Sequence, residues 1–179
     1  MQTDKDYSTN ILKAYLRYLK LERNYSINTI DAYKHDIRCL LDYCLEIGQN
    51  VLQLRLEDLQ NFAATIHEKG IGPTSQARIL SGVRSFYRYM LLDGYIGADP
   101  AELLESPNLG QHLPEVLSTP EVDKLEKGID LTGKEGQRNK AIIEVLFSCG
   151  LRVSELVNLK LSQLFLDEGF VQVIGKGSK

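Results

Sequence analysis

Apolar side chains recur at helical spacing through the first hundred residues of the chain. Residues three and four apart lie on one face of an α-helix, so each apolar stripe predicts an amphipathic helix. The clearest stripe consists of Ile30, Tyr33, Ile37, Leu40, Leu41 and Cys44. It follows Ser26, a residue type favoured at helix N-caps, and stops at Gly48, a residue type favoured just beyond helix C-termini. The pattern therefore predicts a helix between these two residues.

Four other segments of this region show the same helical pattern. They are a first helix from about Ser8 or Thr9, a third helix over 57–69, a fourth over 74–92 and a short fifth helix after Asp99-Pro100. Glycine follows the third and fourth helices, where it commonly ends a helix. We therefore expect residues 1–105 to form a bundle of four or five helices.

A change of composition marks the end of this bundle. Residues 106–117 begin with SPNLGQHLP, which is poor in apolar side chains and holds two prolines and one glycine. This composition is typical of a linker. Ser118 and Glu121 then form a capping-box pattern, in which each side chain caps the other's backbone N–H at the start of a helix. We expect that helix to run to about Lys127 and to open a second domain over 118–179.

The second domain combines helices with a small sheet. A helix is predicted over 138–148, and its nearly continuous apolar run at 142–147 predicts burial on all sides. A shorter helix is predicted over 153–159. Two β-type segments, 164–166 and 170–174, are separated by Asp-Glu-Gly and predict a β-hairpin. The chain ends in the turn that follows, so we expect it to be a fragment with an unpaired strand edge. The predicted fold is therefore mainly α, with a truncated α+β second domain.

Composition excludes few classes of protein. No apolar run approaches the roughly 18 residues of a membrane-spanning helix, and the N-terminus is polar, so we expect a cytoplasmic protein without a membrane partner. The three cysteines and three histidines show no metal-ligand spacing, which predicts no metal site.

The net charge of −3 is unusual for a nucleic-acid binder, but residues 69–92 hold four cations and no carboxylate. A local basic face remains possible on an acidic molecule.

The predicted fourth helix has two contrasting faces. One is apolar and comprises Ile79, Val83, Phe86, Tyr87, Met90 and Leu91. The opposite one comprises Arg78, Ser81, Arg84, Ser85, Arg88 and Tyr89. Such a polar face is commonly just solvated, whereas a face with arginines, no acid and the small residues Ser81, Gly82 and Ser85 also suits a phosphate backbone. Both interpretations stay open on composition alone.

Three residues of the second domain have side chains suited to phosphate chemistry. Arg152 follows Gly150 at a turn between two predicted helices, with Glu155 one helical turn further on. The pair is either a local ion pair of small energy or an anion-binding arginine oriented by a carboxylate. Lys176 lies between two glycines after the predicted hairpin. One interpretation is an ordinary lysine in a turn. The other is a functional lysine that contacts a phosphate or acts as a general acid.

Several motifs resemble those of one protein family. FSCGLRVSEL at 147–156 closely resembles the arginine motif of Xer-type tyrosine recombinases, which belong with the phage integrases. RNKAIIEVL at 138–146, LPEVLSTPEV at 113–122 and VIGKGSK at 173–179 also resemble that family. NYSINTIDAYKHDI at 24–37 and RILSGVRSFYRYM at 78–90 are similar to its helical DNA-binding module. The resemblance covers nearly the whole chain, in order, with Asn139 where the family often has Asp.

This resemblance implies a fold, a reaction and a set of roles. The family has a SAM-like, four- or five-helix core-binding domain and a catalytic domain that together clamp duplex DNA, and its protomers form a tetramer on DNA. It exchanges strands through a 3′-phosphotyrosine, without metal or other cofactor. Arg152 would bind the scissile phosphate, Glu155 would orient that arginine, and Lys176 would be the general acid. The implied DNA contacts are Thr29, Tyr33, Lys34, Arg78, Ser81, Arg84, Ser85 and Arg88.

Several elements of the family pattern, including the His or Trp that follows its later H-x-x-R motif, have no counterpart in this chain. The family's later H-x-x-R motif and its nucleophilic tyrosine are missing, since all nine tyrosines lie between Tyr7 and Tyr95. We therefore expect site-specific recombination of the longer parent and no cleavage by these 179 residues. Two other hypotheses remain: a naturally short DNA-binding module that pairs with a full-length recombinase, and a helical adaptor whose basic face contacts protein. The Xer-like linker favours chromosome-dimer resolution over integration of a mobile element.

Overall fold

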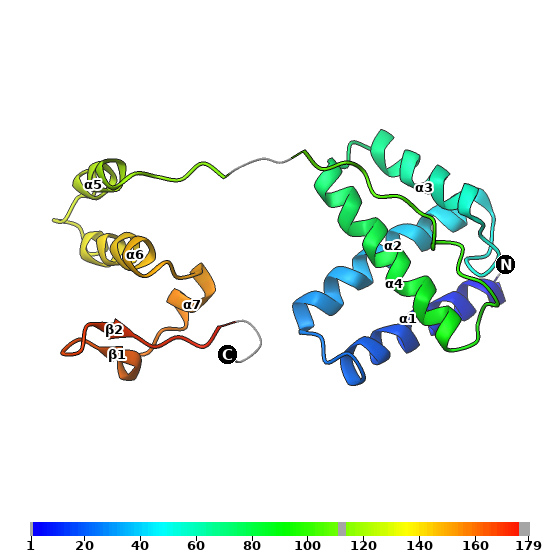
Figure 1. Cartoon of the computed structure of the whole chain (residues 1–179), viewed down its shortest axis with the longest axis horizontal. Coiled ribbons are helices and arrows are strands. Elements are labelled where there is room, and N and C mark those ends of the chain that lie inside the picture. The colour runs from blue at the N-terminus through cyan, green and yellow to red at the C-terminus, as the bar shows by residue number, and fades with distance from the viewer. Residues whose placement is uncertain (1, 111–113, 176–179) are drawn as a thin grey trace. The chain divides into compact units, whose positions relative to one another are not determined.

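The computed structural model describes residues 2–110 and 114–175, with side chains from Ser8 onward. The chain divides into two compact units, residues 1–111 and 112–179, which are described separately below. Figure 1 shows the helices of the first unit and the helices and hairpin of the second.

The first unit is a four-helix bundle. Its helices are α1 (Gln2–Leu21), α2 (Ile27–Ile47), α3 (Leu56–Glu68) and α4 (Pro73–Leu92). Helix α4 packs against α2 and α3, and α1 packs against α2 (Figure 1). The bounds predicted for α2, α3 and α4 are confirmed to within about a residue. Helix α1 begins at Gln2, earlier than predicted, because no proline or glycine interrupts the helix before Ser8.

Local capping sets the ends of α2. Ser26 Oγ accepts a hydrogen bond from the Thr29 N–H at 3.3 Å, as the sequence predicted. Gly48 follows the helix with φ of +67°, in the left-handed region that favours glycine, and its N–H bonds to the carbonyl of Leu45. These two residues fix where α2 begins and ends.

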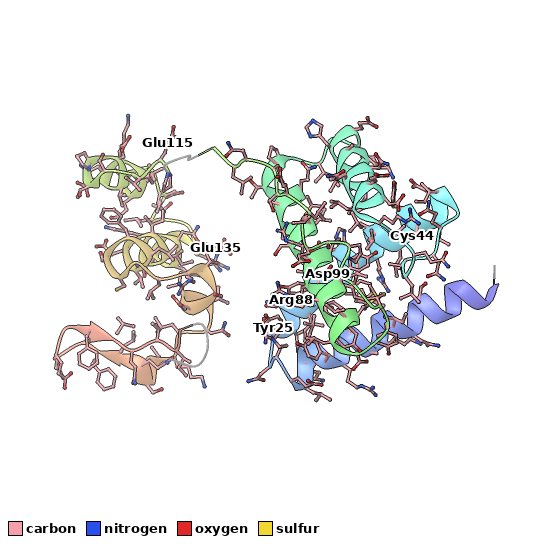
Figure 2. All side chains as sticks on the ribbon, turned by 45° about the vertical axis from the view of Figure 1, so that its right-hand side comes forward. Tyr25, Cys44, Arg88, Asp99, Glu115 and Glu135 are labelled. Carbon is pink, nitrogen blue, oxygen red and sulfur yellow. The ribbon has the colours of Figure 1, made fainter. Side chains whose placement is uncertain are left out.

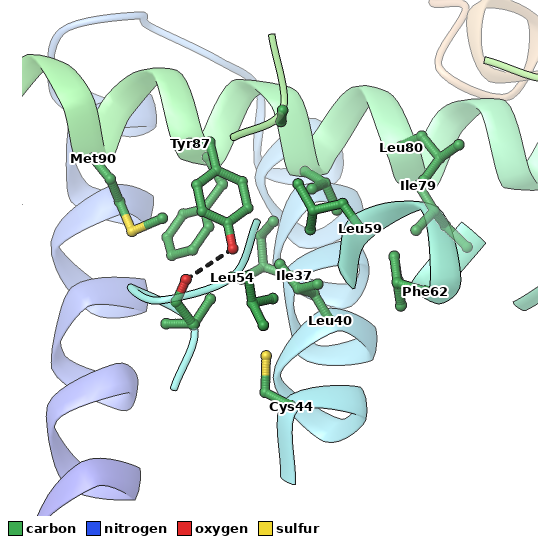
Figure 3. Close-up of a cluster of buried hydrophobic side chains, with 14 of the residues drawn as sticks. Ile37, Leu40, Cys44, Leu54, Leu59, Phe62, Ile79, Leu80, Tyr87 and Met90 are labelled. Carbon is green, nitrogen blue, oxygen red and sulfur yellow. Dashed lines mark hydrogen bonds between the residues drawn. The ribbon is translucent and has the colours of Figure 1, made fainter. Parts of the chain in front are cut away.

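The core of the bundle is aromatic and aliphatic. Tyr15, Phe86 and Tyr87 are fully buried, and large aromatic side chains of this kind supply much of the hydrophobic stabilisation of a small domain. The Tyr87 hydroxyl donates to the Val51 carbonyl at 2.8 Å, so its polar end is satisfied inside the core (Figure 3). Burial raises the pKa of Tyr87, which keeps this hydroxyl protonated as a donor.

The predicted fifth helix is wrong. Residues 100–103 form a turn, in which Asp99 Oδ1 accepts from the Ala101 N–H at 2.8 Å and the Ala101 carbonyl accepts from the Leu104 N–H at 3.1 Å. Asp99 satisfies the backbone with its own side chain, which competes with helix formation. Ala101 and Leu104 are nevertheless buried in the core of the bundle.

The second unit contains three helices and one hairpin within its described residues. Its elements are α5 (Thr119–Lys127), α6 (Gly136–Cys149), α7 (Val153–Val157), the 3₁₀ turn η1 (Leu161–Gln163), β1 (Leu164–Phe165) and β2 (Phe170–Val171). At the start of α5, Glu121 Oε2 accepts from the Ser118 N–H at 2.8 Å and from its hydroxyl at 2.6 Å, so the predicted carboxylate cap is confirmed. The hairpin is confirmed but shorter than predicted, with Leu164 opposite Val171.

Helix α6 is not buried on all sides, contrary to the prediction. Ile142 is 36% exposed and Phe147 is 46% exposed. Burial on all sides needs neighbours on all sides, and in the described part of the chain the elements that pack closely on α6 are α5 and α7. The apolar run therefore predicts the helix but not its surroundings.

Candidate functional site

A groove on the first unit lies between α4 and the turn that joins α1 to α2. It has a volume of about 360 Å³, and its lining includes Arg23, Arg84 and Arg88. None of the lining residues carries a carboxylate. We call this feature the arginine groove. Figure 2 labels Tyr25 and Arg88, which line it from the turn and from α4.

The serines and arginines of α4 have different roles in this groove. The Arg84 guanidinium donates to the Leu104 carbonyl and to the Ser106 hydroxyl, both at 2.8 Å, and so holds the segment that leaves the bundle. Ser85 is half-buried and accepts from the Tyr15 hydroxyl at 2.9 Å. Arg88 is exposed and forms no hydrogen bond or ion pair with the described residues. Arg88 is therefore the arginine of α4 most available to a ligand.

Arg78 differs from the other two arginines of α4, because α2 supplies an acid beside it. Its guanidinium is hydrogen-bonded to the carboxylate of Asp36, a residue that is only 2% exposed. Burial raises the pKa of Asp36, while the Arg78 charge acts in the opposite direction. A Cβ on Gly82 would lie 2.9 Å from the Asp36 side chain, so Gly82 serves the contact between α2 and α4. The prediction that Gly82 lets a phosphate backbone approach closely stays a prediction.

A second groove adjoins the first. It has a volume of about 440 Å³ and is lined by Thr29, Arg78 and other residues of α2 and α4. Tyr33 and Ser81 line both grooves. The half-buried Lys34 lines neither of them. The structure thus brings most of the predicted DNA contacts of α2 and α4 to one continuous face.

Two positions of α4 are reversed relative to the predicted faces. Tyr89, placed on the polar face, is 5% exposed, and Leu91, placed on the apolar face, is 40% exposed. The Tyr89 ring lies 5.0 Å from the ring of Tyr18 and 5.4 Å from that of Tyr15, both on α1. Helix α1 therefore covers a position that the pattern of α4 alone assigned to solvent.

Arg152 and Glu155 form a compact pair at the start of α7. Gly150 ends α6 with φ of +61°, and Arg152 occupies the N-cap of α7. Glu155 Oε2 accepts from the Arg152 backbone N–H at 2.8 Å, and Oε1 accepts from its guanidinium at 2.7 Å. These hydrogen bonds lower the pKa of Glu155, so it is ionised at neutral pH. The Arg152 side chain remains 70% exposed.

Lys176 lies outside the described residues, so its position relative to Arg152 stays a prediction. Within the part of the chain that is described, no three histidine, cysteine or carboxylate side chains gather as a metal site would require. None of the helices described has the length and apolar character of a transmembrane span.

Sequence reasoning missed Asp36 and Arg23. Asp36 had a recognisable signal, because it lies three residues after Tyr33 and four before Leu40, on the apolar face of α2. An acid at such a position predicts a buried partner of opposite charge. Arg23 had no comparable signal, because it precedes α2 in a turn, and only the fold places it in the arginine groove.

Comparisons with known proteins agree for the two units. A family model described as "Phage integrase, N-terminal SAM-like domain" matches residues 12–94, and one described as "Phage integrase family" matches residues 115–179. Tyrosine recombinase XerD of Listeria monocytogenes serovar 1/2a is 37% identical over 95% of the chain. Tyrosine recombinase XerC of Pseudomonas savastanoi pv. phaseolicola is 40% identical over 94%. The chain spans 58% and 56% of the lengths of these two relatives.

A solved structure is similar in fold. It is a lambda integrase tetramer bound to a Holliday junction, with a TM-score of 0.72 and 16% identity, covering 95% of this chain and 48% of that one. At this identity the likeness concerns the fold alone.

Proposed function

Because the chain belongs to the phage integrase family of tyrosine recombinases, we propose that it is part of a Xer-type site-specific recombinase that cuts and rejoins duplex DNA. The relatives named XerD and XerC support this proposal, and the Xer-like linker favours a role in chromosome-dimer resolution. The lambda integrase tetramer on a Holliday junction supports assembly of several protomers on DNA. We also propose a cytoplasmic location, because the proposed substrate is chromosomal DNA.

The Arg152–Glu155 pair is the observation that carries this proposal. A guanidinium has five N–H donors in a planar fork that matches a phosphate. Glu155 takes one of them and holds the group in place, and the guanidinium makes no other hydrogen bond within the described residues. Its remaining donors are free to bind the scissile phosphate. Negative charge that develops on this phosphate during strand cleavage is best met by donors that are already oriented.

The other catalytic roles follow from the family resemblance. Lys176 matches the family's lysine, and we assign to it protonation of the 5′-oxygen leaving group. Residues 115–179, which match the catalytic family model, contain no tyrosine. The proposal therefore assigns no nucleophile to this chain.

The first unit supplies the DNA-binding surface in this proposal. Tyr33, Ser81, Arg84, Ser85 and Arg88 line the arginine groove and would face the phosphate backbone, because arginines without acidic partners attract it. The proposed surface extends from this groove to Thr29 in the second groove. Lys34 of α2 lines neither groove and stays a predicted contact. Arg78 is the exception, since its charge is balanced by Asp36 and it acts chiefly through the contact between α2 and α4.

We predict that Arg152→Lys impairs strand cleavage much more than DNA binding in a recombinase that contains these residues together with the nucleophile. Lysine keeps the charge but loses the planar fork, and the lost contact matters most when charge builds on the phosphate. By analogy with arginine fingers, the loss of rate is on the order of 10³-fold. The measurement is single-turnover cleavage of a nicked suicide substrate that carries the recombination site of the source genome, beside a binding titration.

Arg138→Lys is the matched control. Arg138 is also exposed and lies 3.0 Å from a carboxylate oxygen of Glu135, three residues away, but it is on α6 and outside the arginine motif. We expect this variant to cleave at the normal rate. Equal losses of binding and cleavage in Arg152→Lys, or equal losses of cleavage in the two variants, would remove Arg152 from the catalytic site.

A further inference from the structure

The turn between α1 and α2 places a cation on the wall of the arginine groove. Asn24 adopts a left-handed backbone conformation with φ of +49°, and the chain reverses here so that the Tyr25 N–H bonds to the Leu19 carbonyl at 3.1 Å. This reversal brings Arg23 and Tyr25 to the groove, opposite α4. The position depends on the turn, so it is not visible in any helical pattern.

One tyrosine of the groove contacts the Arg23 side chain, and a second tyrosine stacks on the first. The Arg23 guanidinium carbon lies 5.9 Å from the centre of the Tyr25 ring, within the range of a cation–π contact. The Tyr25 ring stacks in turn on Tyr33 of α2, with ring centres 5.9 Å apart and planes inclined by 18°. A guanidinium held over a ring loses less conformational freedom on binding a ligand than a free one.

The charges around the groove distinguish its arginines from Arg78. Among the described residues, the partners of Arg23 and Arg84 are neutral groups, and Arg88 has no partner. Three arginines therefore line one groove, and no carboxylate is in its lining. Arg78, in contrast, is paired with Asp36. A groove of this charge and chemistry suits an anion with several acceptor oxygens.

We propose that Arg23 and Arg88 together bind a backbone phosphate of duplex DNA in the arginine groove, with Tyr25 as the positioning residue for Arg23. The inference rests on the proposed function, in which the first unit binds duplex DNA, and it adds the α1–α2 turn to that interface. Arg23 replaces Arg78 as a direct phosphate contact. The resulting surface combines residues of the α1–α2 turn with residues of α4.

The test is a binding titration of the whole chain on a short duplex of arbitrary sequence at several salt concentrations. Each lost phosphate contact lowers the slope of log affinity against log salt by about 0.9. We expect that decrease for Arg23→Ala and for Arg88→Ala, and no decrease for Arg23→Lys. Arg38→Ala is the control, because Arg38 is an exposed arginine of α2 that lines a different cavity.

The outcomes separate the inference from the function on which it rests. A lower slope for Arg88→Ala with an unchanged slope for Arg23→Ala overturns the inference and leaves DNA binding by α4 intact. Unchanged slopes for both variants, with duplex binding by the native chain, overturn the inference and leave DNA binding by another surface. No duplex binding by the native chain at low salt overturns the proposed function and the inference with it. A decrease for Arg38→Ala equal to that for Arg23→Ala would show a general charge effect and would also overturn the inference.

Tyr25→Leu tests the positioning role. Leucine keeps apolar bulk at this half-buried position but removes the ring over which Arg23 is held. We expect weaker binding with an unchanged salt slope, because the charge remains while its orientation is lost. Thermal unfolding of the variant checks that the bundle is intact. Native affinity in a folded Tyr25→Leu variant would show that Tyr25 does not position Arg23.

Discussion

Arg78 and Arg88 lie on the same helix and carry the same charge, but their surroundings differ. Arg88 meets no acid among the described residues, whereas Arg78 meets Asp36, whose side chain is only 3% exposed. A pattern along one helix reports which residues share a face, but it does not report what a neighbouring helix places opposite. The sequence therefore predicted the local pair of Arg152 and Glu155, three residues apart, and missed the pair of Asp36 and Arg78, 42 residues apart.

We predict that Arg78→Ala lowers the free energy of unfolding by about 2 kcal/mol. Removing one partner of a buried ion pair costs about 3–5 kcal/mol, because the other charge stays buried without compensation. The value here is smaller because the Arg78 side chain is 47% exposed and its charge is partly screened by water. Urea unfolding of the native chain and the variant measures the difference.

Two further variants complete this measurement. In Arg78→Ala with Asp36→Asn no buried charge is left unpaired, so we expect this double variant to be more stable than Arg78→Ala alone. Arg88→Ala is the control and should change the stability by no more than about 0.5 kcal/mol, as is usual for an exposed side chain. A similarly small effect for Arg78→Ala would show that the ion pair contributes little to the fold.

At the scale of elements, the helices of the bundle were predictable because their signals are local. Ser26, Gly48 and the apolar stripe between them are all contained in one segment, and α2 has those bounds. Two features that the sequence missed depend on distant contacts, because α1 covers Tyr89 and α6 lacks neighbours on part of its surface among the described residues. The turn that replaces the predicted fifth helix is local instead, because Asp99 accepts from the N–H of Ala101, two residues further on.

Gly82 lies in a tight contact between α4 and α2, where an added Cβ would be 2.9 Å from the Asp36 side chain. We predict that Gly82→Ala destabilises the bundle by about 1–3 kcal/mol, the usual cost of overpacking a tight contact. In an open helix the same change would stabilise by up to about 1 kcal/mol, because alanine favours helix more than glycine. A lower free energy of unfolding for Gly82→Ala therefore indicates a tight contact at this position, and a higher one indicates open space.

Gly97→Ala is the matched control for this experiment. An added Cβ at Gly97 would meet nothing within 4 Å, and the residue is exposed in the loop after α4. We expect near-native stability for this variant. A stabilised Gly82→Ala chain would contradict the close contact with Asp36.

At the scale of the whole molecule, the proposed DNA-binding surface and the proposed phosphate site lie in different units. The first unit carries the arginine groove, and the second carries Arg152 and the match to the catalytic family model. Order along the chain made this division predictable, because each unit's motifs are continuous in sequence. The structure divides the chain between residues 111 and 112. We propose the finer limits 1–105 for the first domain, 106–117 for the linker and 118–179 for the second domain.

The central claim is that these 179 residues bind DNA and hold part of a phosphate site but supply no nucleophile. The most direct measurement is electrophoresis of the chain with a nicked suicide duplex, which traps covalent complexes, with and without denaturing detergent. The duplex carries the recombination site of the source genome, and the salt concentration is low. We predict a shifted complex that detergent abolishes. A complex that survives detergent would contradict the claim, because one of the tyrosines from Tyr7 to Tyr95 would then be the nucleophile.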